Sequence, residues 1–133
     1  MKVVPVVAGC IVEDRRLLLT RITESKSPET IGMWEMPGGK MEEGEAPEVA
    51  LARELFEELG VVVQVKGLLH AQINKYSSNV PYLVLFYHCV ILAKKSAGEG
   101  LETKWTCPHD EGLENVSPGA QEALRELISR GGW

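Results

Sequence analysis

Residues 39–61 read GKMEEGEAPEVALARELFEELGV, and this segment decides how the chain is interpreted. Residues 44–60 are predicted to form a helix, because a proline falls in the first turn and a glycine follows the last. Three glutamates, Glu54, Glu57 and Glu58, lie close to its end. Like charges three or four residues apart repel on a helix, and the helix dipole is negative at the C-terminal end. Because this arrangement costs electrostatic free energy, we expect the three glutamates to have a function that requires them.

The helical geometry places these glutamates together. At about 100° per residue, all three fall within one arc about 100° wide. The adjoining arc is apolar and is the predicted core-facing stripe. Its members are Val49, Leu51, Ala52, Leu55, Phe56 and Leu59. The glutamates are therefore expected at the edge of the buried face, where a helix can line a cleft.

The charge around this helix is uneven. Between Glu35 and Glu58 there are eight glutamates but only Lys40 and Arg53 as cations, so this stretch has a net charge of −6. The whole chain has a net charge of −5. The remaining residues are close to neutral, which indicates a local acidic site. A solvated acidic face is the alternative interpretation. Excess carboxylate oxygens suit Mg²⁺ or Mn²⁺, so the stretch predicts a metal site.

The two glycines of the preceding PGGK sequence, Gly38 and Gly39, strengthen this prediction. They are expected to allow positive φ angles and to let the backbone approach a metal ion or a phosphate closely. An ordinary turn is the alternative for such a pair.

Length and composition are those of one globular domain, residues 1–133, with 44% hydrophobic and 25% charged residues. The negative net charge argues against a nucleic-acid-binding surface, and no apolar run reaches the roughly 18 residues of a membrane span. Three cysteines without paired or metal-type spacing predict reduced thiols and a cytoplasmic protein. Cys10 and Cys89 are expected to be buried. The apolar residues 3–12 are predicted to form a strand rather than a processed leader.

The elements alternate along the chain. Strands are predicted at residues 3–12, 16–23, 61–71, 81–93 and 103–106, a short extended piece at 32–36, and helices at 44–60 and 117–129. Strands interleaved with two widely spaced helices predict an α/β fold in which a mixed central sheet lies between helices.

Residues 39–61 also match, without departure, the Nudix signature G-x5-E-x7-R-E-U-x-E-E-x-G-U, where U is a bulky aliphatic residue. The nine specified positions are Gly39, Glu45, Arg53, Glu54, Leu55, Glu57, Glu58, Gly60 and Val61. The chain thus resembles the Nudix hydrolase family, and residues 32–45, GMWEMPGGKMEEGE, resemble its MutT-like branch. The resemblance implies an α/β/α sandwich and Mg²⁺-dependent hydrolysis of a pyrophosphate bond in a nucleoside diphosphate derivative. A normal or modified nucleoside triphosphate, cut to the monophosphate and pyrophosphate, is the favoured substrate.

The resemblance also implies roles for individual residues. Glu57 and Glu58 would be the principal metal ligands, with the Gly38 carbonyl completing the set. Glu54 would be a further ligand or the catalytic base, Arg53 would orient the carboxylates, and Glu45 would brace the loop against the helix. A further catalytic carboxylate is expected after the last long strand, where the candidates are Glu102 and then Glu99.

Substrate contacts are predicted at Gly39, Lys40, Gln121 and Tyr76. Gln121 stands near the start of the last helix, where MutT-like relatives present a base-reading side chain. Aromatic residues that could stack on a base are Trp34, Tyr76, Tyr82 and Phe86.

Other branches of the family supply the alternatives. Dinucleoside-polyphosphate hydrolases carry a tyrosine about as far beyond the signature as Tyr76, so hydrolysis of such compounds or of ADP-ribose stays open. The intact set of signature glutamates argues against a non-catalytic nucleotide-binding module. The expected partner is a small nucleotide, with no nucleic-acid polymer and no membrane, and a homodimer is common among relatives.

Overall fold

The computed structural model describes residues 2–24, 28–75 and 80–133. The chain begins with a β-hairpin made of β1 (Val4–Glu13) and β2 (Arg16–Arg21), with Glu13 opposite Arg16. Asp14 and Arg15 form the two-residue turn, and both have positive φ, 50° and 60°. Positive φ at both central residues is what a tight hairpin turn with the twist of the strands requires.

The sheet is mixed and is centred on β1. Its order is β3-β2-β1-β6-β5, while β4 pairs with β1 and β7 pairs with β2. Only the β1–β6 contact is parallel among these pairings; the rest are antiparallel. The remaining strands are β3 (Trp34–Glu35), β4 (Gly38–Lys40), β5 (Val61–Lys75), β6 (Pro81–Lys94) and β7 (Thr103–Thr106).

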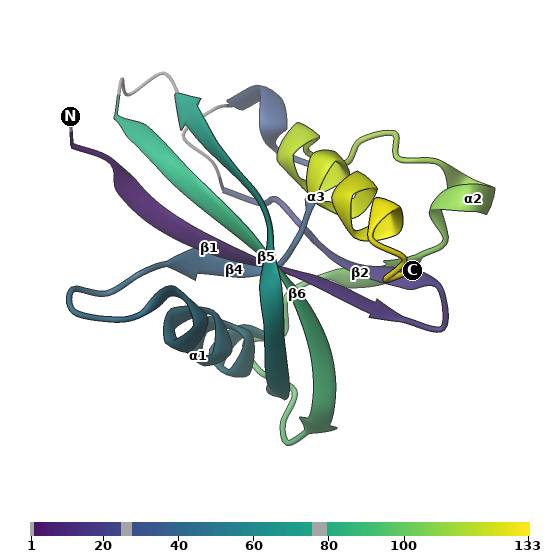
Figure 1. Ribbon diagram of the computed structural model, residues 1–133, viewed down its shortest axis with the longest axis horizontal. Helices are drawn as coiled ribbons and strands as arrows, with labels where there is room; N and C mark the ends of the chain where they lie inside the picture. The colour runs from purple at the N-terminus through teal and green to yellow at the C-terminus, as the bar shows by residue number, and fades with distance from the viewer. Residues whose placement is uncertain (1, 25–27, 76–79) are drawn as a thin grey trace.

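Two helices cover opposite faces of this sheet (Figure 1). They are α1 (Pro47–Leu59) and α3 (Pro118–Ser129), each with a proline in the first turn. The α/β/α arrangement predicted from the sequence is therefore confirmed. The sequence did not predict the short helix α2 (Pro108–Glu111) or the 3₁₀ turn at Pro28–Thr30.

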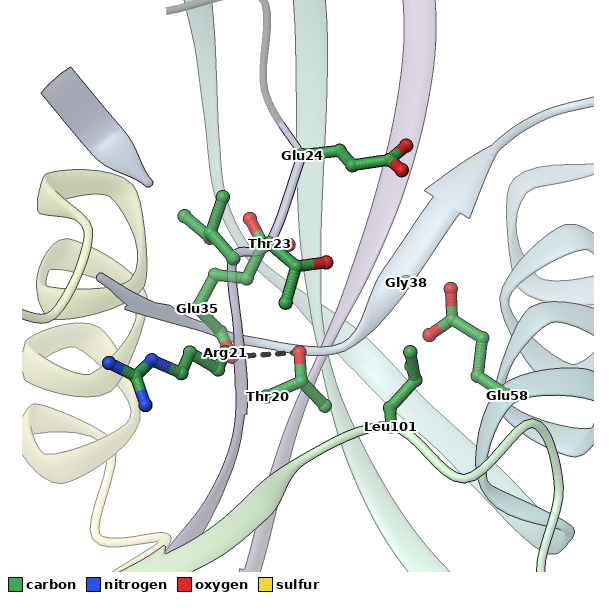
Figure 2. A pocket seen from close by; sticks show the side chains of 9 residues that line it. Thr20, Arg21, Thr23, Glu24, Glu35, Gly38, Glu58 and Leu101 are labelled. Carbon is green, nitrogen blue, oxygen red and sulfur yellow. Dashed lines mark hydrogen bonds between the residues drawn. The ribbon is translucent and has the colours of Figure 1, made fainter. Parts of the chain in front are cut away.

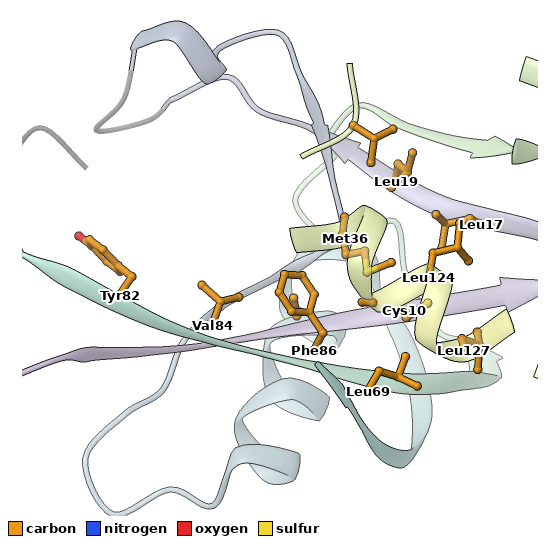
Figure 3. Close-up of a cluster of buried hydrophobic side chains, with 14 residues drawn as sticks. Cys10, Leu17, Leu19, Met36, Leu69, Tyr82, Val84, Phe86, Leu124 and Leu127 are labelled. Atoms are coloured by element: carbon orange, nitrogen blue, oxygen red, sulfur yellow. The ribbon is translucent and has the colours of Figure 1, made fainter. Parts of the chain in front are cut away.

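The core has two halves because successive side chains of a strand point to opposite faces. In β1, Ala8 and Cys10 face α3, whereas Val7 and Ile11 face α1. Figure 3 shows the α3 half, in which the β6 side chains Tyr82, Val84 and Phe86 follow one another along the strand.

The two strand cysteines are buried, as the sequence predicts, and are unpaired. Cys10 lies in the α3 half of the core and Cys89 in the α1 half. Burial raises the pKa of each thiol to about 12.

The buried stripe of α1 differs from the prediction. Ala50, Leu51, Leu55 and Leu59 are buried, but Val49 and Phe56 are 59% and 49% exposed. Glu54 and Glu58, on the side of Ala50, are half-buried, and Glu57 is exposed. The reason is that only the side of α1 against the sheet and β4 is covered, and a helical wheel cannot tell which of two apolar edges that will be.

The ends of α1 follow local chemistry. The predicted helix begins at residue 44, but Gly44 has φ +80° and the helix starts at Pro47. Gly60 ends it in the left-handed conformation and donates its N–H to the Phe56 carbonyl, as predicted. Within the described ranges, no helix combines the length and the apolar character needed to cross a bilayer.

Candidate active site on the edge of helix α1

The glycine pair of β4 lies directly against α1 and β1. A Cβ at Gly39 would come within 2.5 Å of the Glu54 carboxylate, and one at Gly38 would collide with the Val7 carbonyl oxygen. Neither glycine is among those with positive φ, so that part of the prediction is wrong. The pair is needed because the backbones and the Glu54 carboxylate approach closely, and only hydrogen fits between them.

Arg53 is the centre of the charged network beside these glycines. Its guanidinium donates two hydrogen bonds to the Glu45 carboxylate, with N···O distances of 2.7 and 2.9 Å. It also donates to Glu54 at 3.0 Å, to Glu57 at 3.3 Å and to the Lys40 carbonyl at 3.2 Å. The planar fork of arginine thus connects α1 to the loop that precedes it.

Glu45 joins that loop to the network. Its carboxylate accepts a hydrogen bond from the Glu42 N–H at 2.8 Å in addition to the two from Arg53. These hydrogen bonds, led by those from Arg53, lower the pKa of Glu45 to about 2. Glu45 stays ionised and secures the loop against α1.

Glu58 lies in a more confined and more negative environment. Figure 2 shows its carboxylate reaching from α1 toward Gly38, in a small hollow of about 150 Å³ that Glu35, Thr20 and Arg21 also line. Desolvation is the main cause that raises its pKa to about 8, and the charges of Glu54, Glu99 and Glu35 add to it. A hydrogen bond from the Gly38 N–H opposes the shift.

The donor chemistry of this region fits a hard divalent cation. Burial and then the neighbouring carboxylates raise the pKa of Glu58, and a dication would relieve the repulsion between these carboxylates. As the side chains now lie, no three acidic, histidine or cysteine side chains of the described residues converge into a metal-binding group. Glu54 and Glu57 instead share Arg53. Any ion would therefore be held by Glu54, Glu57 and Glu58 only after their side chains turn.

The two candidate carboxylates after β6 lie in different places. Glu102 forms an ion pair with Arg21 at 3.3 Å, and its carbonyl accepts the Arg21 N–H. Glu99 donates its N–H to the Glu58 carbonyl at 3.0 Å and contributes to the raised pKa of Glu58. The charge of Glu99 thus acts on Glu58, whereas Glu102 is paired with Arg21.

Glu35 is a site residue that the sequence reasoning missed. It lines both the small hollow and a larger one described below, and the Thr20 hydroxyl contacts its backbone carbonyl at 3.5 Å. Its side chain is exposed, yet desolvation by the protein around it raises its pKa to about 7. Its position two residues before Pro37-Gly38-Gly39 was the available signal, because β4 begins at Gly38 and contacts α1.

The second hollow, of about 700 Å³, extends from Gly38, Gly39 and Lys40 across the α3 side of the sheet. That volume is in the range of small-molecule sites. The Tyr82 and Phe86 rings line it, as do residues 117–119 at the start of α3. Gly39 and Lys40, predicted as substrate contacts, line this second hollow but not the small one, whereas Gly38 lines both.

Other predicted contacts are elsewhere. Gln121 donates its amide to the Leu113 and Val116 carbonyls at 3.3 and 2.9 Å, so it supports the loop before α3, and it is not among the residues that line the hollow. Trp34 is not among the residues that line the hollow, and Lys104 and Arg21 lie over its ring at 4.5 and 5.9 Å. Tyr76 lies outside the described residues.

Comparison with known proteins places this geometry in context. The NUDIX domain model matches residues 3–127. The chain is 30% identical over 128 residues to the CTP pyrophosphohydrolase of Escherichia coli K12, covering 96% of this chain and 93% of that protein. It is 28% identical over 131 residues to the 8-oxo-dGTP diphosphatase of Haemophilus influenzae, again covering 96% and 93%.

One further match covers part of the chain, and another covers almost all of it. Relatives from Mycobacterium tuberculosis are 50% identical over 58 residues, but that stretch covers only 44% of this chain and 40% of theirs. The MutT NUDIX hydrolase from Burkholderia pseudomallei superposes with a TM-score of 0.81 at 24% identity, covering 96% of this chain and 99% of that one, and so shares the fold.

Proposed function

We propose an activity from one premise: the chain belongs to the NUDIX domain family. The activity is hydrolysis of a pyrophosphate bond in a nucleotide. The favoured substrate is a nucleoside triphosphate, normal or modified, which takes up one water and yields the monophosphate and pyrophosphate. Relatives named as a CTP pyrophosphohydrolase and an 8-oxo-dGTP diphosphatase support this reaction class. The proposed catalytic unit is residues 1–133 as one domain.

One observation carries the proposal. The Glu54 carboxylate lies against Gly39, which lines the 700 Å³ hollow, and Glu58 lines the small hollow, which shares Gly38 with the larger one; a reacting centre and room for a nucleotide therefore adjoin. A polyphosphate is itself negative and cannot bind carboxylates directly. Mg²⁺ or Mn²⁺, held by Glu54, Glu57, Glu58 and the Gly38 carbonyl, would neutralise phosphate charge and lower the pKa of the attacking water.

The chain's own residues have distinct proposed roles. Arg53 orients the carboxylates, since it contacts Glu54 and Glu57 with one nitrogen and Glu45 with the other two. Glu54 is the leading candidate for accepting the water proton, with Glu102 behind it. Lys40 follows Gly39 on the wall of the hollow, where its ammonium can attract a phosphate.

The test is a substrate panel with product identification. Purified protein is incubated with nucleoside triphosphates, ADP-ribose and dinucleoside polyphosphates in Mg²⁺, and products are separated by chromatography. We expect a triphosphate to give monophosphate and pyrophosphate, and excess chelator to stop turnover. Faster turnover of ADP-ribose or a dinucleoside polyphosphate would move the substrate class to that branch. Absence of turnover with every compound would overturn the proposal.

A further inference from the structure

The inner face of β5 carries an unusual row of polar side chains. His70, Gln72 and Asn74 lie opposite Phe86, Val84 and Tyr82 of β6. Opposed residues of an antiparallel pair point to the same face, and the three β6 residues belong to the α3 half of the core. Polar groups on a core-facing surface cost free energy unless they are hydrogen-bonded, so this row needs an explanation.

The three side chains form one directional chain of hydrogen bonds. The Gln72 Nε2 donates to the Asn74 Oδ1 at 2.6 Å. The Gln72 Oε1 contacts the His70 Nε2 at 2.8 Å. Because that amide oxygen can only accept, His70 Nε2 is the donor, and every donor in the chain points from His70 toward Asn74.

This direction decides what Asn74 offers to a ligand. Its Oδ1 is occupied by Gln72, and its Nδ2 has no hydrogen-bond partner among the residues that the structure describes. Asn74 lines the 700 Å³ hollow together with Gln72, Tyr82 and Phe86. A ring that enters the hollow therefore meets aromatic surfaces and, at one edge, an N–H donor.

Gln72 is held in place by more than hydrogen bonds. A Cβ at Gly119, in the first turn of α3, would come within 3.0 Å of the Gln72 Nε2 and 2.7 Å of the Phe86 ring. The helix thus packs tightly against the middle of the chain, and the His70 ring lies 5.8 Å from the Phe86 ring. The orientation of the Gln72 amide, which contacts Asn74, is therefore set by packing as well as by polarity.

We propose that Asn74 selects the nucleobase by donating its side-chain amide N–H to an exocyclic carbonyl oxygen of the base, and that Gln72 and His70 are positioning residues that keep the amide in this orientation. The inference rests on the proposed function in taking the ligand to be a nucleotide. It narrows the substrate class to nucleotides whose base carries a carbonyl at the edge facing β5.

The test measures base preference by binding, which needs no turnover. Inosine and adenosine monophosphates differ mainly in a carbonyl against an amino group, and their dissociation constants are measured by calorimetry. The wild-type protein should bind inosine monophosphate more tightly. Asn74→Asp keeps the acceptor for Gln72 but replaces the free donor with an acceptor. The ratio of the two dissociation constants should therefore change by about tenfold or more and invert, so that adenosine monophosphate binds more tightly.

Two further variants separate selection from folding. Gln64→Glu makes the same chemical change at an exposed position of β5 and should keep the wild-type ratio. Gln72→Met retains size but removes the link to Asn74, so the ratio should move toward one while inosine monophosphate still binds. A thermal unfolding curve for each variant shows whether the fold is retained.

The outcomes distinguish the two proposals. An inverted ratio without hydrolysis of any nucleotide supports the role of Asn74 and overturns the proposed function. Hydrolysis with an unchanged ratio in Asn74→Asp overturns the role of Asn74 and leaves the function standing. Failure of the wild-type protein to bind either monophosphate, or its preference for adenosine monophosphate, also overturns the inference.

Discussion

The edge of α1 and the hollow on the opposite face of the sheet are built in different ways. The charged side chains at α1 come from one continuous segment, the helix and the loop before it, and Arg53 lies within 4 Å of four carboxylates of that segment. The hollow is lined by residues from β1, β4, β5, β6 and the start of α3. The geometry of a single segment is fixed by its own spacing, so a substitution there disturbs the whole charged group. A hollow lined by several elements can change its shape through a substitution in one element while the others keep their positions. We therefore expect α1 to determine the reaction and the hollow to determine the substrate.

The largest effect should come from removing one α1 carboxylate. Glu57→Gln should lower metal-dependent turnover on the order of a thousandfold, because a lost ligand removes several kcal/mol of transition-state stabilisation. The fold should be intact, since Glu57 is exposed and contacts only Arg53 among its described ion pairs. Steady-state rates and a thermal unfolding curve check both statements. Glu43→Gln, with the same charge change at an exposed position, is the control, and near-full activity of Glu57→Gln would remove Glu57 from the ligand set.

The glycine pair where the two regions meet should separate folding from catalysis. Gly39→Ala would push its Cβ into the Glu54 carboxylate, a movable group, so activity should fall about a hundredfold while the fold is retained. Gly38→Ala would strike the β1 backbone, which cannot move as easily, and should cost about 2 kcal/mol or more of unfolding free energy. Denaturant unfolding and rates are measured on both variants. Equal stability of the two would show that β4 and β1 are less tightly packed than described.

A change where the start of α3 lines the hollow should act on substrate binding instead. Gly119→Ala would move Phe86 or Gln72 into the hollow, because its Cβ would lie 2.7 and 3.0 Å from them. We expect KM to rise about three- to tenfold with kcat within about twofold, as for a loss of uniform binding. Steady-state kinetics on the best substrate of the panel measures both constants. A fall in kcat with unchanged KM would contradict the division of roles between the two regions.

The smallest effect concerns pH and stability in chelator. The pKa of Glu58 is raised to about 8 from an ordinary 4.5, so the folded state binds a proton more tightly than the unfolded chain between these values. The unfolding free energy contributed by Glu58 is thus complete below pH 4.5 and declines as the pH rises toward 8. The midpoint temperature should fall by about 3 °C between pH 5 and 8, after allowance for solvent screening.

A variant and a metal ion provide the controls for this dependence of the midpoint temperature on pH. Glu58→Gln should lose that part of the pH dependence because the amide does not titrate. Mg²⁺ at pH 8 should raise the wild-type midpoint, since it binds the folded protein. If the midpoint temperature of Glu58→Gln falls with pH as steeply as that of the wild type, the pH dependence belongs to other groups.

Much of the fold was predictable because its signals are local. Prolines and Gly60 mark the helix ends, and alternating apolar residues mark the long strands. The two cysteines of β1 and β6 were correctly expected to be buried. The short helix α2 was missed, because four residues provide no helical period to recognise.

The sequence by itself determined the family and the position of the carboxylates on one helix, because these depend on spacings within one segment. Tertiary structure decided which side of α1 is covered, that Glu35 and Glu99 act on Glu58, and that Gln121 supports a loop. It also decided that His70, Gln72 and Asn74 face a hollow. These facts depend on which strands pair and on where α3 packs, and contacts between residues far apart in the chain leave no pattern in either segment alone.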